Sequence, residues 1–199
     1  MSKILSILIC TIPGRETLFS QLTQELTSQI EELGLVGRVE IISSHTIKNQ
    51  PSIGVKRNKL KAIAQGHYIC YFNDDDLPEA NYLKKITQVI LHYPSIDVAP
   101  DIITFNMQKF NDAVYERTYK IIMGTNNWPA EQLTFLDDNF LPLCPHKKAV
   151  AMLVNFPDQN HKSDMAYSAD LKKHIGSSQH IDDVLYNYYF SEKNSAARN

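Results

Sequence analysis

The chain has 199 residues, the length of a single domain. Hydrophobic residues make up 43% and charged residues 21%, which excludes a composition too polar to bury a core. With 20 lysines and arginines against 22 acids, the net charge of −2 gives no general attraction to nucleic acid or to anionic membranes. Three cysteines, an odd number, indicate free thiols in a reducing compartment, and no apolar stretch is long enough to span a bilayer. We expect a cytoplasmic protein.

The first half of the chain alternates between strand patterns and helix patterns. Short apolar runs rich in isoleucine are typical of strands buried on both faces, and leucines at helical spacing between them predict amphipathic helices. The predicted strands are Ile4–Cys10, Val39–Ile42 and His67–Phe72. The predicted helices run from Leu18 to Leu33, ended by Gly34, from Val55 to Ala64, and across Leu83 to Tyr93. This alternation indicates a right-handed parallel α/β sheet.

After Pro94 the pattern changes, and turn-forming residues separate the apolar runs. Further strands are predicted at Ile102–Phe105, Tyr115–Ile122 and Val184–Phe190, the first two paired antiparallel at a mixed edge. Two short helices are predicted near His146–Val154 and Ser163–His174. The loop-rich residues between 123 and 145 favour a lid or a substrate wall, and the polar residues from 191 onward are expected to fray.

Three adjacent aspartates, Asp74 to Asp76, directly follow the third predicted strand. Adjacent carboxylates cannot all stay ionised without a counter-charge, and carboxylate oxygens are ligands suited to Mg²⁺ or Mn²⁺. The carboxyl end of a central strand is also where open α/β sheets bind their ligands. The competing interpretation is an acidic turn that caps a helix beginning near Glu79.

The order of motifs along most of the chain resembles family-two glycosyltransferases with the GT-A fold, which use nucleotide-activated sugars. The segments that carry this resemblance are Ser6–Arg15, Gly54–Lys59, Gly66–Pro78, Leu143–Lys148 and Ser163–Ser168. They are similar to the opening strand, the Arg-Asn helix, the DXD region, the acceptor-side segment and the Glu-Asp motif of that family. The likeness is greatest to short stand-alone members of bacteria and phages.

The resemblance implies a single α/β domain over residues 1–199, of the GT-A-type Rossmann-like three-layer fold with a mixed, mainly parallel central sheet. Residues 1–94 would form the nucleotide-sugar-binding half, residues 95–190 the acceptor-side half, and residues 191–199 a flexible tail. The implied donor-binding residues are Thr11, Pro13, Arg15, Arg57, Asn58 and Asp74.

The resemblance also implies the chemistry. Asp75 would be the principal ligand of Mn²⁺ or Mg²⁺, with Asp76 beside it, and the metal would bridge the diphosphate of the donor. Asp164 would be the general base that takes the proton of an acceptor hydroxyl during a single inverting displacement. The expected activity is that of a hexosyl- or pentosyltransferase.

The sequence departs from the family pattern at three places. Asn73 stands where the first aspartate of DXD is common, and Ser163 replaces the glutamate before Asp164. Ser43-Ser44-His45 follows the second strand in place of an aspartate that reads the base, which leaves the nucleotide open, with a uridine diphosphate sugar preferred. Substitutes for the base would be Asp158, Asp170 and Asp182.

The acceptor is the least defined partner. Trp128, the only tryptophan, stands in a loop with two asparagines and could stack on a sugar face. We expect residues 123–173 to build the acceptor wall, completed where needed by a homo-oligomer. The acceptor would be a glycan or a hydroxymethylated base of phage DNA. Two other functions stay open: a sugar-phosphate nucleotidyltransferase, and a non-catalytic module that binds nucleotides or glycans.

Overall fold

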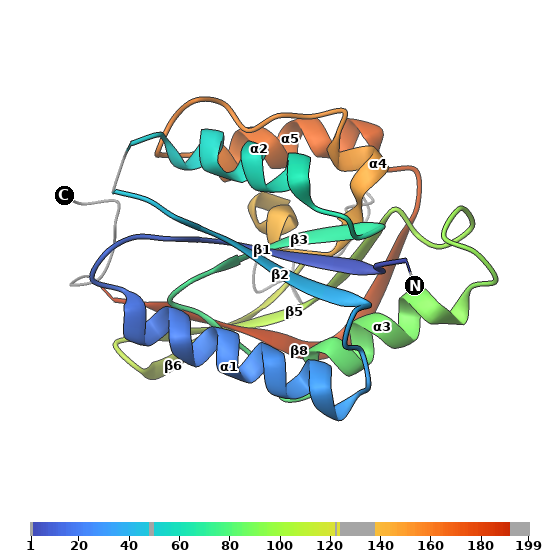
Figure 1. Ribbon diagram of the computed structural model, residues 1–199, viewed down its shortest axis with the longest axis horizontal. Helices are drawn as coiled ribbons and strands as arrows, with labels where there is room; N and C mark the ends of the chain where they lie inside the picture. Colours follow the sequence, from blue (N-terminus) through green and yellow to red (C-terminus); the bar gives the residue numbers. More distant parts are fainter. Residues whose placement is uncertain (1, 48–49, 122, 124–137, 192–199) are drawn as a thin grey trace.

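The computed structural model describes residues 2–47, 50–121, 123 and 138–191. These residues form three layers, with one mixed sheet between two layers of helices (Figure 1). Helices α1 (Glu16–Glu32) and α3 (Tyr82–His92) cover one face of the sheet (Figure 1). Helices α2 (Ile53–Ile63), α4 (Lys148–Ala151) and α5 (Ser163–Leu171) cover the other face (Figure 1). The predicted α/β class with a mixed sheet is confirmed.

The parallel part of the sheet has β1 (Leu5–Thr11) at its centre, between β2 (Val39–His45) and β3 (Tyr68–Asn73). Six of the seven residues of β1 are buried, as expected of a strand with helices on both sides. Gly34 ends the first helix region with φ +64, a left-handed conformation that suits glycine. This βαβ arrangement follows the sequence pattern closely.

The chain after β3 adds five strands, so that the sheet continues in the order β3-β7-β5-β8-β4, with β6 paired to β5. The strands are β4 (Leu77–Pro78), β5 (Ile102–Asn111), β6 (Val114–Lys120), β7 (His146–Lys147) and β8 (Ser178–Phe190). β5 runs parallel to β8, whereas β6 and β7 pair with it antiparallel. Two short 3₁₀ helices complete the described elements: η2 (Asp138–Leu143) precedes β7, and η3 (Lys172–His174) directly follows α5. The antiparallel hairpin predicted after Pro94 is confirmed.

Several boundaries differ from the sequence prediction. The strands β4 and β7 have two residues each, too few to produce a recognisable alternation of apolar and polar residues. β8 starts six residues before the predicted Val184. A shift of register between β5 and β8 falls in the early part of β8, where it breaks the alternation on which a strand prediction depends. Helix α3 starts at Tyr82 and not near Glu79, so the aspartates do not reach its first turn. The prediction that they cap this helix was wrong.

Two further expectations concern composition. Cys10, Cys70 and Cys144 are all free thiols, which agrees with the expectation of a chain without disulfides. No helix in the described part of the chain is long and apolar enough to cross a membrane.

Candidate active site

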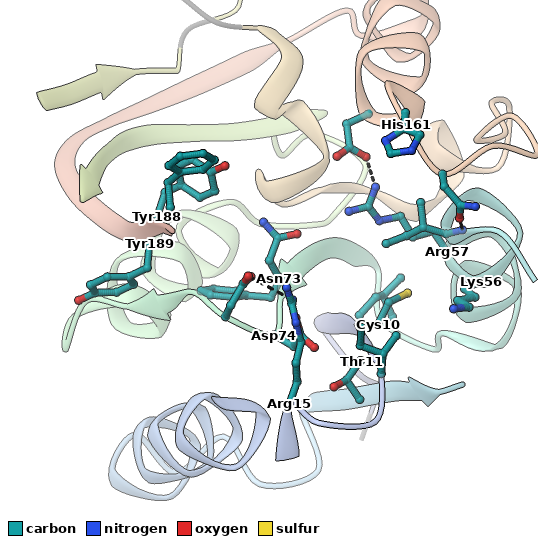
Figure 2. Close-up of a pocket in the computed structure, with 18 of the residues that line it drawn as sticks. Cys10, Thr11, Arg15, Lys56, Arg57, Asn73, Asp74, His161, Tyr188 and Tyr189 are labelled. Atoms are coloured by element: carbon teal, nitrogen blue, oxygen red, sulfur yellow. Dashed lines mark hydrogen bonds and ion pairs between the residues drawn. The ribbon is translucent and has the colours of Figure 1, made fainter. Parts of the chain in front are cut away.

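A cavity of about 310 Å³ opens at the carboxyl ends of β1 and β3 (Figure 2). The parallel register pairs Thr11 with His45 and Cys10 with Asn73, so these strand ends lie side by side. Three cationic and three acidic side chains line the described part of the cavity: Arg15, Lys56, Arg57, Asp74, Asp75 and Asp164. Residues from five segments far apart in sequence therefore meet at the edge where α/β sheets bind ligands.

The acidic wall of the cavity is built by the turn after β3, and an arginine from the turn after β1 lies against it. Nη1 of Arg15 lies 2.5 Å from Oδ1 of Asp74 and 3.1 Å from Oδ2 of Asp75. Burial lowers the pKa of the Arg15 guanidinium, but the charges of Asp75 and Asp74 outweigh that effect and raise it. Burial raises the pKa of Asp75, Arg15 opposes this, and Asp74 adds to it. Arg15 is thus the counter-charge of both carboxylates.

Asp76 faces a different environment from its two neighbours. Its Oδ2 accepts hydrogen bonds from the Tyr186 hydroxyl at 2.6 Å and from Asn73 Nδ2 at 2.8 Å, and its Oδ1 accepts from Tyr189 N at 2.8 Å. Burial raises the pKa of Asp76 to about 8, the charge of Asp75 adds to this, and the hydrogen bonds oppose it. Asp76 connects the acidic turn to β8, and both of its oxygens are engaged.

The cationic wall comes from α2. Arg57 is 6% exposed and lies against the rings of Tyr71 and Phe156, with its guanidinium carbon 5.7 Å and 5.2 Å from their centroids. Its Nη1 donates to Oδ1 of Asp164 in a close ion pair. Burial lowers the pKa of both Arg57 and Lys56. These two cations are buried at the wall of the cavity, where they attract anions more strongly than they would in water.

Asp164 stands in the first turn of α5, and its side chain is 45% exposed, so one face of the carboxylate is open to the cavity. His161 also lines the cavity, three residues earlier (Figure 2). Of the four carboxylates proposed as the base, Asp164 is the one found among the described lining residues. The others make separate bonds: Asp158 with Ser52, Asp170 with Lys173, and Asp182 with Lys120.

A segment between α4 and α5, residues 154–162, holds α5 against α2; we call it the strap. Asn58 Nδ2 donates to Phe156 O at 2.8 Å and Asn58 Oδ1 accepts from Phe156 N at 3.0 Å. Lys61, 2% exposed, donates to Ala151 O and to Val154 O, and burial lowers its pKa to about 8. Asn58 therefore binds the strap and lies outside the cavity lining, whereas the sequence placed it at the donor.

A second cavity, of about 330 Å³, adjoins the first and shares Thr11 and Ile12 with it. Pro13, Phe19, His45 and Thr46 complete much of its wall, and Phe19 meets the His45 ring edge-on at 4.8 Å. The hydroxyl oxygens of Thr11 and Thr46 are buried there without a hydrogen-bond partner. Buried polar atoms normally have partners, so these two hydroxyls are available to a ligand.

By itself, the acidic turn can supply only some of the ligands that a divalent cation needs. No group of three or more histidine, cysteine or acidic side chains able to hold a metal occurs among the described residues. Magnesium at nucleotide sites commonly takes one or two carboxylates and completes its shell with phosphates and water. Asp75 is partly exposed to the cavity, and Oδ2 of Asp74 is buried without a hydrogen-bond partner. These two carboxylates fit such a metal.

Sequence reasoning missed several residues of the cavity. Asn160 and His161 from the strap line it, as do Tyr188 and Tyr189 from the end of β8 (Figure 2). Lys56 was not among the predicted donor-binding residues, although its place next to Arg57 was a usable signal. Pro13 lines the second cavity. Trp128, most of the predicted acceptor wall before residue 138, and residues 192–199 lie outside the described residues.

No protein-family model and no curated protein sequence matches the chain. Solved structures of the Staphylococcus aureus glycosyltransferase TarS do match. TarS 1–349 in complex with UDP-GlcNAc has a TM-score of 0.66 and 14% identity, covering 98% of this chain and 61% of that chain. TarS 1–349 alone has a TM-score of 0.63 and 15% identity, covering 94% of this chain and 60% of that chain. This chain thus spans less than two thirds of their length, and it has the fold of these glycosyltransferase structures.

Proposed function

We propose that this chain is a glycosyltransferase that moves a sugar from a nucleotide sugar, with a uridine diphosphate donor preferred, to a hydroxyl acceptor. One observation carries the proposal: a single cavity brings cationic side chains, a pair of adjacent carboxylates and a separate, partly exposed carboxylate together. The binding of UDP-GlcNAc by TarS, which has the same fold, supports it.

The two adjoining cavities match the two ends of a nucleotide sugar. The second cavity, with its apolar ring of Phe19 and its two hydroxyls without partners, suits a nucleobase and ribose. Thr11 lines both cavities. A nucleotide whose base and ribose occupy the second cavity would therefore extend past Thr11 and have its diphosphate in the first cavity, which Arg15, Lys56 and Arg57 line. Arginine suits this role because its planar guanidinium donates several hydrogen bonds to phosphate oxygens.

Asp75 and Asp74 would hold Mn²⁺ or Mg²⁺, whose charge would stabilise the departing nucleoside diphosphate. Arg57 and Lys56 add positive charge at the same position, and their partial burial strengthens it. The rings of Tyr71 and Phe156 hold the Arg57 guanidinium in place.

Asp164 would act as the general base. The acceptor oxygen attacks the anomeric carbon and forms the new C–O bond, the bond to the diphosphate oxygen breaks with its electron pair leaving on the nucleoside diphosphate, and the hydroxyl proton passes to Asp164. A single displacement of this kind inverts the anomeric centre. The half-exposed position of Asp164 at the cavity wall supports this assignment.

The acceptor we propose is a hydroxyl-bearing glycan or a hydroxymethylated base of phage DNA. Residues 123–173 would build its wall, within an acceptor-side half of residues 95–190 that shares one domain with the donor half of residues 1–94, and a homo-oligomer would complete the wall where needed. The net charge of −2 favours a glycan over DNA, because binding along the many phosphates of a DNA backbone is strengthened by a cationic surface.

The test is release of nucleoside diphosphate from a panel of nucleotide sugars, because slow transfer to water needs no acceptor. We expect Mn²⁺-dependent release from one donor, lowered about 10²–10⁴-fold by Asp164→Asn while nucleotide affinity stays the same. Asp170→Asn is the matched control, since Asp170 lies on the same helix, pairs with Lys173 and is outside the cavity. If no donor binds and none is turned over, the proposal is wrong.

A further inference from the structure

Arg15 occupies the place between the two carboxylates at which a divalent cation would bind. We propose that Arg15 is an exchangeable counter-cation: it competes with the metal for Asp75 in the free protein and transfers to the donor diphosphate when metal and donor bind together. This inference rests on the proposed function, because it takes a nucleoside diphosphate as the ligand.

The contacts of Arg15 are the basis of the proposed competition. One nitrogen, Nη1, bridges Oδ1 of Asp74 and Oδ2 of Asp75, at 2.5 Å and 3.1 Å. A cation bound to Asp75 on that side would stand next to a guanidinium of like charge. Two cations close together in a partly buried site repel strongly. Metal binding to Asp75 and the present position of Arg15 therefore oppose each other.

The backbone around Arg15 is fixed, so the exchange involves its side chain alone. Gly14 N donates to Oε1 and Oε2 of Glu16 at 3.0 Å and 3.1 Å, and Gly14 has φ +91. Arg15 N donates to Ile12 O at 3.3 Å. The guanidinium stands on a long, rotatable chain that is 15% exposed, at the wall of the cavity proposed for the diphosphate.

The two aspartates leave capacity for a second cation. Asp74 is nearly buried, and its Oδ1 accepts from Arg15 while its Oδ2 has no partner. The Asp75 side chain is 24% exposed. One guanidinium provides a single positive charge against two carboxylates, so a negative charge remains. A divalent cation neutralises the pair once Arg15 has found a new anion, which the diphosphate supplies.

The exchange makes metal and nucleotide binding mutually dependent. In the free protein the metal must displace Arg15, which weakens its affinity. With nucleoside diphosphate present, Arg15 has a phosphate partner and the metal binds more tightly. By linkage, the metal must tighten nucleotide binding by the same factor.

The experiment measures Mn²⁺ binding by electron paramagnetic resonance, with and without UDP, and UDP binding by calorimetry, on folded protein verified by circular dichroism. Arg15→Gln removes the competing charge, and Arg15→Ala is a second variant in case the first does not fold. Arg15→Lys keeps the charge. Lys59→Gln is the matched control, because it removes one positive charge from an exposed position of α2 outside the lining of the cavity.

Without UDP, we expect Arg15→Gln to bind Mn²⁺ about tenfold more tightly than wild type, which corresponds to about 1.4 kcal/mol. Arg15→Lys and Lys59→Gln should change this affinity less than threefold, and Arg15→Gln should lose most of the mutual tightening by UDP. Unchanged or weaker Mn²⁺ binding by both Arg15→Gln and Arg15→Ala overturns the exchange and leaves the proposed function standing if wild type still binds UDP. A wild type that binds no nucleotide overturns both.

Discussion

Substitution of Asn58 distinguishes clearly between two roles for this residue, donor binding and stabilisation of the fold. The resemblance places it near the diphosphate, whereas the structure shows both ends of its amide bonded to the backbone of Phe156. We predict that Asn58→Ala destabilises the fold and leaves nucleotide affinity nearly unchanged.

The magnitude follows from the contacts. The two hydrogen bonds, of 2.8 Å and 3.0 Å, are each worth about 1 kcal/mol. Phe156 is 2% exposed, so the truncation also leaves its backbone N–H and C=O short of partners, at a cost of about 1 kcal/mol or more. We expect the free energy of unfolding to fall by about 2–4 kcal/mol.

The assay combines urea unfolding with calorimetric titration of UDP at a temperature where both proteins are folded. Lys59→Ala is the control, because Lys59 is the exposed neighbour on the same helix. The dissociation constant for UDP should change less than about threefold, which is under 1 kcal/mol. A large loss of UDP affinity without loss of stability would refute the reasoning and return Asn58 to the donor site.

The other predictions concern the metal, the strap and a buried histidine. Asp75→Asn should abolish Mn²⁺ stimulation of donor turnover, measured against wild type with chelator. Gly54→Ala should destabilise the protein by about 1–3 kcal/mol in urea unfolding, because its Cβ would lie 1.9 Å from Pro157 O; unchanged stability would mean that the strap moves freely. Burial lowers the pKa of His146 to about 4, so the unfolded state binds its proton first as pH falls below 6.5. The free energy of unfolding should therefore drop by about 2 kcal/mol between pH 7 and pH 5, a component that His146→Asn should lack.

The fold was predictable where local pattern and tertiary structure agree. The alternation that gave β1, α1, β2, α2 and β3 reflects burial on both faces of the strands and on one face of each helix. β4 and β7 exist because neighbouring strands offer them backbone partners, which two residues of sequence cannot indicate. The start of β8 was missed because the register shift places Asp182 and Asp183 in the strand against its alternation.

The sequence was sufficient to predict which segments form the site, but not which side chains of these segments contact each other. The position of the three aspartates after a central strand indicated a ligand site, and Asp74 and Asp75 do line the cavity. The sequence could not show that Asp76 faces Tyr186, since adjacent residues at a turn take unrelated directions. It also could not show the strap, because the bonds between Asn58 and Phe156 join residues far apart in the chain.

The balance of charge in the cavity links these observations. Its described lining carries three cations and three carboxylates, and Arg15 and Arg57 are each paired with carboxylates of the same cavity. A diphosphate brings several negative charges into a site where burial makes unpaired charge costly. It can be accommodated only if a divalent cation enters with it or if the arginines turn from their aspartates to the phosphates. The second route releases a carboxylate from its arginine, and for Arg57 that carboxylate is Asp164, so a turn of Arg57 to the diphosphate would leave the proposed base available to the acceptor hydroxyl.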